Sequence, residues 1–247
     1  MSNSSDRATT LWRGQEVPWP GPPADHVVLP DYLERHYAWA YLDPRNASVF
    51  DTHAFLELLL FGHYRRLGNA ALRAFDSPTS QKLLQVGCAY GNLTPRLAKQ
   101  PSVSKLDVVD VAPLQLDLLR RKLPTDSAVT LKRQDATRLA YPDDHFDGVL
   151  LFFLLHELPV EAQRRALAEA LRVCRPDGNV VVIDYHRPHP LQPLRWLLPW
   201  VFSRLEPFAL KFWSTPIADL LPHASSAQIT ATRYWFGSLY RQVTLTP

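Results

Sequence analysis

Five short runs of apolar, β-prone residues between positions 82 and 185 constrain the fold of this chain more than any other feature. The runs are KLLQVG, LDVVDV, VTLKR, FDGVLLFF and NVVVIDY, and stretches with helical character separate them. Because strands that alternate with helices pair in parallel, the pattern predicts an α/β fold. Two later runs, QITATRYW and SLYRQVTLT, flank Phe236-Gly237 and predict an antiparallel pair that closes the sheet. The expected fold is a doubly wound, mostly parallel seven-stranded sheet.

The segments around this core predict one elaborated domain preceded by an arm. Residues 1–30 contain five prolines and polar residues, so we expect a flexible arm without regular structure. Apolar residues recur at helical spacing after Asp31, with an interruption at Pro44. The expected domain, residues 31–247, then divides into a helical cap (31–78), a cofactor-binding core (79–188), a hydrophobic helical insertion (189–222) and the closing strands (223–247).

The composition excludes several classes of protein. A hydrophobic fraction of 46% and a charged fraction of 21% support a buried core. The net charge of +3 is too small to indicate a nucleic-acid partner. Two cysteines cannot form a disulfide framework, and the first residues lack an apolar leader, so we expect a cytoplasmic protein. No uncharged run reaches the ~18 residues that a membrane span requires.

Polar residues follow each of the five predicted strands. In an open parallel sheet, the ligand lies outside the carboxyl ends of the strands, so these residues are expected to meet. A glycine turn after the first strand and an acid after the second are typical of a site for a nucleoside cofactor. The residues are Gly87 to Asn92, Asp110, Asp135-Ala136, His156-Glu157 and Asp184-Tyr185-His186.

The spacing of the glycine turn distinguishes the nucleoside cofactors. A dinucleotide fingerprint requires G-x-G-x-x-G/A, and counting from Gly87 finds Ala89 and Asn92 at its later positions, which disfavours NAD. The turn fits the looser G-x-G-x-G of class I S-adenosylmethionine-dependent methyltransferases, with Gly91 at the last position. LLQVGCAYGNLT, VVDVAP, RQDATRLAYPDDHFDGVLLFFLLHELP and ALRVCRPDGNVVVID resemble the motifs of that superfamily in order and spacing.

This resemblance implies where S-adenosylmethionine is held. It assigns Gly87 and Gly91 to the methionine part, Asp110 to the ribose diol, and Asp135 with Ala136 to the adenine. The further candidate cofactor-binding residues are Gln85, Ala89 and Val111. At the end of the first strand the superfamily usually carries an acid that helps to hold the cofactor's amino group, and this chain has Gln85. An amide stabilises an ammonium less than a carboxylate does, so we expect a lower amino pKa. The alternative is that Gln85 replaces the acid without any effect on the cofactor.

From about residue 29 the chain resembles a narrower family. LPDYLERHYAWAYLDPR, FGHYRRL, LLFFLLHELP, VIDYHRP and LEPFALKFW are similar to segments of the RquA family of rhodoquinone-biosynthesis proteins. The resemblance implies conversion of ubiquinone to rhodoquinone, in which an amino group replaces a ring methoxy group. It further implies S-adenosylmethionine as the nitrogen donor and a requirement for Mn²⁺. An uncharged amino group, which Gln85 favours, suits attack on a quinone carbon.

The same strand ends supply the remaining candidate residues. His156, Asp184 and His186 carry nitrogen and oxygen ligands that suit manganese, and the alternative is that each makes only local hydrogen bonds. Tyr90, His156 and Tyr185 are the candidate catalytic residues, because proton transfer requires such groups near the reacting atoms. Aromatic faces suit a flat quinone ring, although ordinary core packing explains them equally. The candidate substrate residues are Tyr32, His36, Tyr37 and Tyr41.

The hydrophobic insertion predicts contact with a membrane. Residues 191–213 mix Trp and Phe with Arg and Lys, a combination that suits the interface of the bilayer in which a polyprenyl quinone lies. The alternative is a substrate lid packed on the core. Amino transfer to ubiquinone is the favoured function. Conventional O- or C-methylation of a quinone or other lipophilic ring is the second, and a noncatalytic quinone carrier is the third.

Overall fold

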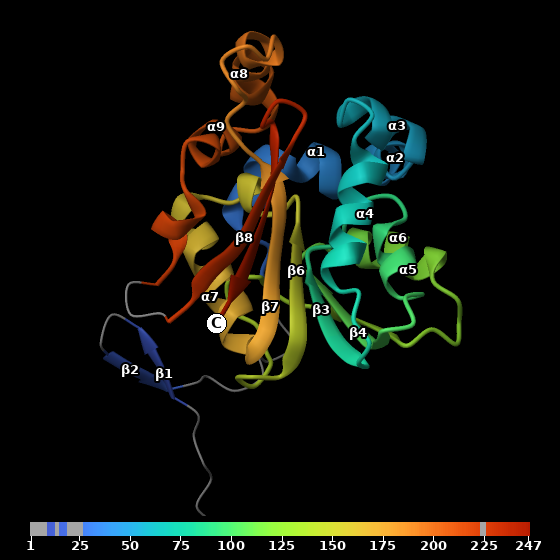
Figure 1. The fold of residues 1–247 in the computed structure, drawn as a ribbon. Coiled ribbons are helices and arrows are strands. Elements are labelled where there is room, and N and C mark those ends of the chain that lie inside the picture. The colour runs from blue at the N-terminus through green and yellow to red at the C-terminus, as the bar shows by residue number, and fades with distance from the viewer. Residues whose placement is uncertain (1–8, 13–14, 19–26, 223–225) are drawn as a thin grey trace, which may run out of the picture.

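The computed structural model describes residues 9–12, 15–18, 27–222 and 226–247, with side chains from residue 27 onward. Its centre is a seven-stranded sheet flanked by helices (Figure 1). The strand order is β5-β4-β3-β6-β7-β9-β8. Every strand is parallel to its neighbours except β9, which runs antiparallel to β7 and to β8. The predicted fold class is therefore confirmed.

The strands form where the apolar runs predict them. Each of the five parallel strands of the core covers all or most of one of those runs, and the last two strands form the closing pair. Their bounds are β3 Gln81–Val86, β4 Val103–Asp110, β5 Val129–Arg133, β6 Phe146–Phe152, β7 Cys174–Tyr185, β8 Gln228–Trp235 and β9 Tyr240–Thr246. The order reverses direction between β3 and β6, which opens a crevice above their carboxyl ends.

Helices cover both faces of the sheet and bury one hydrophobic cluster on each. Helices α4 (Tyr64–Ala74), α5 (Leu93–Leu97) and α6 (Pro113–Lys122) pack on one face, and α7 (Val160–Val173) packs on the other. Successive strand residues divide between the clusters, as Leu83 and Leu84 do, because side chains alternate across a strand. The two cores hold the carboxyl ends of the strands in fixed positions.

The cap and the insertion lie above those carboxyl ends (Figure 1). The cap comprises the π-helical turn η1 (Leu33–Tyr37) and helices α1 (Ala38–Tyr41), α2 (Pro44–Phe50) and α3 (His53–Leu59). Pro44 is the first residue of α2, and the Asp43 carboxylate caps that helix by accepting the Arg45 amide at 2.9 Å. The insertion comprises α8 (Leu194–Leu205), α9 (Ala209–Trp213) and the 3₁₀ turn η3 (Ile217–Leu220).

The arm differs from the sequence-based expectation. Strands β1 (Thr9–Trp12) and β2 (Gln15–Pro18) pair antiparallel, although residues 1–30 were expected to lack regular structure. Threonine and tryptophan favour strands, and Pro18 occupies the final position of β2, where a missing amide interrupts little. Within the described parts of the chain, no helix is both long and apolar enough to cross a membrane.

Candidate functional site

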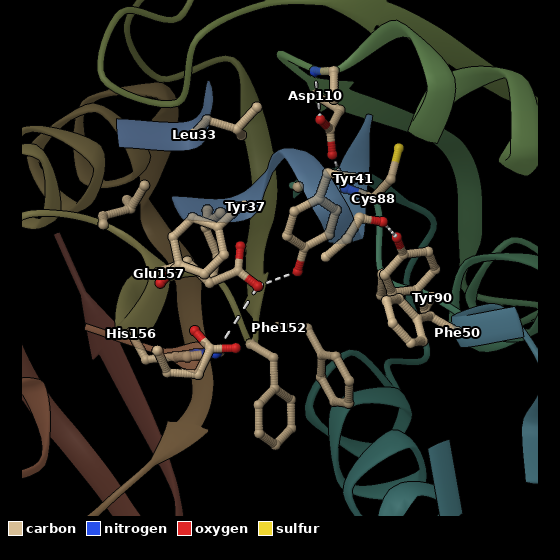
Figure 2. Close-up of a pocket in the computed structure, with 18 of the residues that line it drawn as sticks. Leu33, Tyr37, Tyr41, Phe50, Cys88, Tyr90, Asp110, Phe152, His156 and Glu157 are labelled. Carbon is tan, nitrogen blue, oxygen red and sulfur yellow. Dashed lines mark hydrogen bonds and ion pairs between the residues drawn. The ribbon is translucent and has the colours of Figure 1, made fainter. Parts of the chain in front are cut away.

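A cavity of about 440 Å³ lies at the carboxyl ends of the strands, between the cap and the insertion. Figure 2 shows residues that line it. One end is formed by strand-end turns, and we call it the cofactor end; its residues are Gly87, Cys88, Ala89, Asp110, Val111, Gln134, Asp135 and Ala136. The other is lined mainly by aromatic side chains, and we call it the chamber; its residues include Tyr37, Tyr41, Phe50, Phe55, Tyr90, Phe152, Phe153, Tyr185 and Phe202.

Asp110 organises the cofactor end. Its carboxylate accepts the amide of Cys88 at 2.6 Å and that of Ala112 at 2.8 Å, which ties the glycine turn to the turn after β4. Burial raises the pKa of Asp110 to about 6, although these amide donors act to lower it. Gly87 has φ +87°, a conformation that favours glycine. The Asp110 carboxylate therefore lies beside backbone at Gly87 that a ligand can approach closely. A ribose and the groups attached to it require both features.

Ala89 and Gly91 of the glycine turn differ in whether they line the cavity. Ala89 lines the cavity, as predicted for a cofactor contact. Gly91 does not line it: its amide donates to Asp51 at 2.7 Å, and a Cβ there would collide with the Tyr64 hydroxyl and Leu56. The glycine at this position therefore permits close packing of the cap, and its assigned contact with the methionine part of the cofactor stays a prediction.

Gln85 lies beneath the glycine turn. It is fully buried and does not line the cavity. Its side-chain amide donates to the Gly87 carbonyl at 3.0 Å, and its carbonyl accepts the Thr94 hydroxyl at 2.9 Å. A carboxylate at this position could not donate to Gly87. The glutamine therefore holds the turn, and any effect on the cofactor's amino group acts through that turn.

The turn after β5 completes the cofactor end. Asp135 accepts the amide and the hydroxyl of Thr137, both at 2.8 Å, which fixes the carboxylate at the cavity wall. Val111 and Ala136 also line the cavity, as expected for residues around the ribose and adenine. Sequence reasoning did not single out Gln134, although it is buried and immediately precedes Asp135.

The chamber brings together aromatic residues from distant segments. Tyr41 of the cap stacks on Tyr90 of the glycine turn, with ring centres 5.6 Å apart and an interplanar angle of 8°. The Tyr90 hydroxyl donates to the Ala40 carbonyl at 2.7 Å. Tyr32 and Tyr37 also line the cavity, whereas His36 does not and instead packs edge-on against Phe208. Three of the four predicted substrate residues therefore face the cavity.

A buried cluster of ionisable residues closes the chamber (Figure 2). The His156 Nδ1 atom lies 2.7 Å from an Asp184 carboxylate oxygen, which also accepts the Tyr185 amide at 2.6 Å. Burial would lower the pKa of His156, but the Asp184 carboxylate raises it to about 9. His156 is therefore an imidazolium at neutral pH. Tyr185 packs edge-on against its ring, with centres 4.8 Å apart.

Glu157 is the carboxylate that faces this imidazolium. It accepts a hydrogen bond from the Tyr41 hydroxyl and lies 3.9 Å from the His156 Nε2 atom. Burial raises the pKa of Glu157 to about 8, against the lowering effect of His156. Glu206 of the insertion also lines the chamber, and burial raises its pKa as well. The cluster thus holds one cation beside carboxyl groups, of which Glu157 exchanges its proton about one pH unit above neutrality.

The proposed manganese ligands do not come together. His186 lies in a separate hollow, where its Nδ1 atom is 2.9 Å from the Ser238 carbonyl. The Asp184 oxygens are engaged by His156 and by backbone amides. No group of three His, Cys, Asp or Glu residues in the described part of the chain is arranged to hold a metal ion. The expected trio is corrected accordingly, because these residues do not fit Mn²⁺.

Sequence reasoning missed the acidic half of the chamber. Glu157 was noted beside His156 but received no role, and Glu206 was not noted. One signal for Glu206 was available, because it is the single acid in the apolar segment 191–213. An isolated acid in such a segment is commonly buried against a partner.

The comparisons with known proteins agree with this geometry. Residues 83–178 match the family described as "Methyltransferase domain". A demethylmenaquinone methyltransferase from Lactobacillus johnsonii is 33% identical over 158 residues, which are 61% of this chain and 62% of that relative. The chain thus spans less than two thirds of that relative's length. A 2-phytyl-1,4-naphtoquinone methyltransferase from Synechococcus elongatus is 29% identical over 188 residues, covering 70% of this chain and 75% of the relative.

A solved structure supports the fold. N-methyltransferase NodS from Bradyrhizobium japonicum, in complex with S-adenosyl-l-homocysteine, superposes with a TM-score of 0.54 at 15% identity, covering 73% of this chain and 85% of that one. Residues 83–178 are thus similar to a methyltransferase domain, and the strand order belongs to a fold that this solved methyltransferase shares.

Proposed function

We propose that this protein is an S-adenosylmethionine-dependent transferase that acts on the ring of a lipophilic quinone. The proposal rests on one continuous cavity. At one end of it lies a turn suited to a nucleoside, and at the other lies a chamber of aromatic side chains. Such a cavity holds a polar cofactor and a flat apolar ring in contact. The names of the relatives support the same substrate class, because both act on naphthoquinone-type rings.

The group transferred is, in our proposal, the cofactor's α-amino nitrogen. Bound S-adenosylmethionine supplies either this nitrogen or its sulfonium methyl group. The nitrogen would form a bond to the methoxy-bearing carbon of ubiquinone, and the methoxy group would leave as methanol with the proton that the nitrogen loses. The bond between nitrogen and the cofactor's α-carbon would then break by elimination. The proton from the adjacent carbon would end on the departing nitrogen and the rest of the cofactor would leave with a carbon–carbon double bond, so no external oxidant or reductant is needed. The product is rhodoquinone. The resemblance to the RquA family supports this choice.

The buried cluster supplies the proton transfers of this reaction. Glu157, with its raised pKa, accepts the proton that the attacking nitrogen loses. The Tyr41 hydroxyl holds that carboxylate in place. The His156 imidazolium, fixed by Asp184, donates to a quinone carbonyl oxygen and makes the ring more electrophilic. We assign His156, Asp184 and His186 no joint role as manganese ligands in this step, because His186 lies apart from the other two.

Conventional methylation of a quinone ring is the second candidate, and the names of the relatives favour it. Carbon methylation also requires a base, so Glu157 would serve either reaction. The two differ in which cofactor atom faces the quinone. In methyl transfer the sulfonium methyl points into the chamber, and in amino transfer the α-amino nitrogen does.

Product analysis with two substrates tests the proposal. Purified protein is incubated with S-adenosylmethionine and either ubiquinone or demethylmenaquinone, and the quinones are identified by mass spectrometry. We expect ubiquinone to exchange a methoxy for an amino group. A methylated product alone would favour the second candidate. Quinone binding without any product would contradict both and leave the noncatalytic carrier. Glu157→Gln should strongly reduce turnover, whereas Glu161→Gln, at an exposed acid of α7, should not.

A further inference from the structure

Helix α8 presents large apolar side chains to solvent. Trp196 is 77% exposed and Trp200 is 61% exposed, while Leu198 and Phe202 on the other face of the helix are buried. Guanidinium groups cover both indoles, with Arg195 4.9 Å from the Trp196 ring centre and Arg204 4.2 Å from that of Trp200. We call the exposed face of this segment the α8 lip; it comprises Leu191, Trp196, Leu197, Trp200 and Leu205.

A second apolar face lies on the cap. Leu58 near the end of α3 is 76% exposed, and Leu59 and Phe61 beside it are also exposed. We call this face the cap lip; it comprises Trp39, Val49, Leu58, Leu59 and Phe61. Both lips lie at the end of the molecule where the parallel strands finish (Figure 1). Leu205 of the α8 lip and Leu59 of the cap lip also line the cavity, so the cavity is continuous with both lips.

The surroundings of the α8 lip are basic. Segment 187–213 carries Arg187, Arg195, Arg204 and Lys211, and its one acid, Glu206, lines the chamber. Behind α8 lies a hollow of about 780 Å³, which Arg187, Arg195 and Arg241 help to line and to which no Asp or Glu among the described residues contributes. An apolar face bordered by cations complements a bilayer with anionic headgroups.

We propose that the two lips dock on an anionic phospholipid bilayer, with the indoles at the level of the headgroups and the basic hollow facing their phosphates. The chamber then opens toward the acyl chains, and a quinone ring enters it while its tail stays in the bilayer. This inference rests on the proposed function for its substrate. A bilayer fits better than a protein partner for two reasons. The quinone of the proposed function dissolves in a bilayer, and both lips adjoin the cavity that would bind this quinone.

Binding to vesicles tests the docking surface directly. The full chain is sedimented with vesicles of phosphatidylcholine alone or of phosphatidylcholine with phosphatidylglycerol. We expect strong binding to the anionic vesicles, weakened by salt, and about tenfold weaker binding of the double variant Trp196→Ser/Trp200→Ser. Replacement of both indoles by phenylalanine should largely restore binding. Circular dichroism melting verifies that each variant is folded.

Charge variants separate docking from general electrostatic attraction. Arg195→Gln/Arg204→Gln should reduce binding to anionic vesicles about thirtyfold, because each of the two basic residues near the surface contributes about 1 kcal/mol. The matched control is Arg120→Gln/Arg121→Gln on α6, which should bind as the wild type does. Equal loss in both pairs, or wild-type binding that ignores the anionic lipid, would overturn the proposal. So would a stable dimer in solution that the tryptophan variants convert to a monomer.

Two quinone substrates keep this inference distinct from the proposed function. A tail-less ubiquinone analogue in solution should be turned over equally by the wild type and by Leu58→Ser. A long-tailed ubiquinone in vesicles should be turned over more slowly by that variant. Turnover of the analogue without vesicle binding would overturn docking and leave the function intact. Vesicle binding without turnover of either quinone would overturn the function and leave docking intact.

Discussion

The two ends of the cavity are built in different ways. The cofactor end is made by turns that follow β3, β4 and β5 directly, so its residues are placed by the sheet itself. The chamber is assembled from the cap, the segment after β6 and the insertion, and the Tyr41 and Glu157 that meet there are 116 positions apart in the chain. The cofactor end therefore belongs to the part that resembles a methyltransferase domain, whereas the chamber is built largely from segments outside the strand-end turns.

The largest expected effect falls on the chamber. Glu157→Gln removes the proton acceptor, and we expect turnover to fall about 10²- to 10⁴-fold with unchanged binding of S-adenosylmethionine. In the wild type, the rate should rise with pH through about 8, as Glu157 ionises, and decline through about 9, as His156 loses its proton. The variant should lose the rising limb. An unaltered pH profile would remove Glu157 from the chemistry.

A substitution at the cofactor end should weaken the binding of S-adenosylmethionine. Asp110→Ala removes an acceptor of two hydroxyl groups, so we expect S-adenosylmethionine to bind about a hundredfold more weakly, measured by calorimetry, with quinone binding preserved. Because the pKa of Asp110 is about 6, wild-type affinity should decline as the pH falls below that value. Asp117→Ala, at an exposed aspartate of α6, is the matched control. If quinone binding fell as much as cofactor binding, the two ends would not be separable.

The His156–Asp184 pair should dominate stability within the chamber. Asp184→Asn leaves a buried histidine without its carboxylate, so we expect the free energy of unfolding to decrease by about 3 kcal/mol in urea denaturation. Because folding raises the pKa of His156 from 6.5 to about 9, its contribution to stability is complete below pH 6.5 and is lost as the pH rises through 9. In the variant, NMR titration should find a lower His156 pKa. An unchanged pKa would show that another group holds the imidazolium.

A substitution of Gln85 tests whether the residue beneath the glycine turn affects the pKa of the cofactor's amino group. Gln85→Glu removes the donor to the Gly87 carbonyl, so we expect a loss of about 1–3 kcal/mol in stability. The carboxylate should also favour the ammonium form of the cofactor, which shifts the rate of amino transfer toward higher pH. If stability falls and the pH dependence stays the same, Gln85 supports the turn and has no further role.

His186 should have the smallest effect. Its ring lies in the hollow behind α8, away from the chamber, so His186→Ala should leave the apparent affinity for manganese in the turnover assay unchanged. A weaker manganese response in this variant would restore the ligand set that the sequence predicted.

The contrast between the two ends also explains what the sequence could predict. Apolar runs predicted the strands, and Pro44 marked the interruption between α1 and α2, because those features act within a few residues. The glycine turn and Asp110 followed from spacing for the same reason. The contact between Tyr41 and Glu157, the orientation of His186 away from the chamber and the role of Gly91 beneath the cap depend on how distant segments pack. Periodicity carries no information about those contacts.

The origin of the new ring substituent tests the central claim most directly. Purified protein is incubated with ubiquinone and with S-adenosylmethionine labelled with nitrogen-15 at its amino group, with and without manganese, and the quinone product is examined by mass spectrometry. The account predicts rhodoquinone that carries the heavy nitrogen. A methylated quinone without nitrogen-15 would contradict it and would show that the chamber presents the quinone to the sulfonium methyl group.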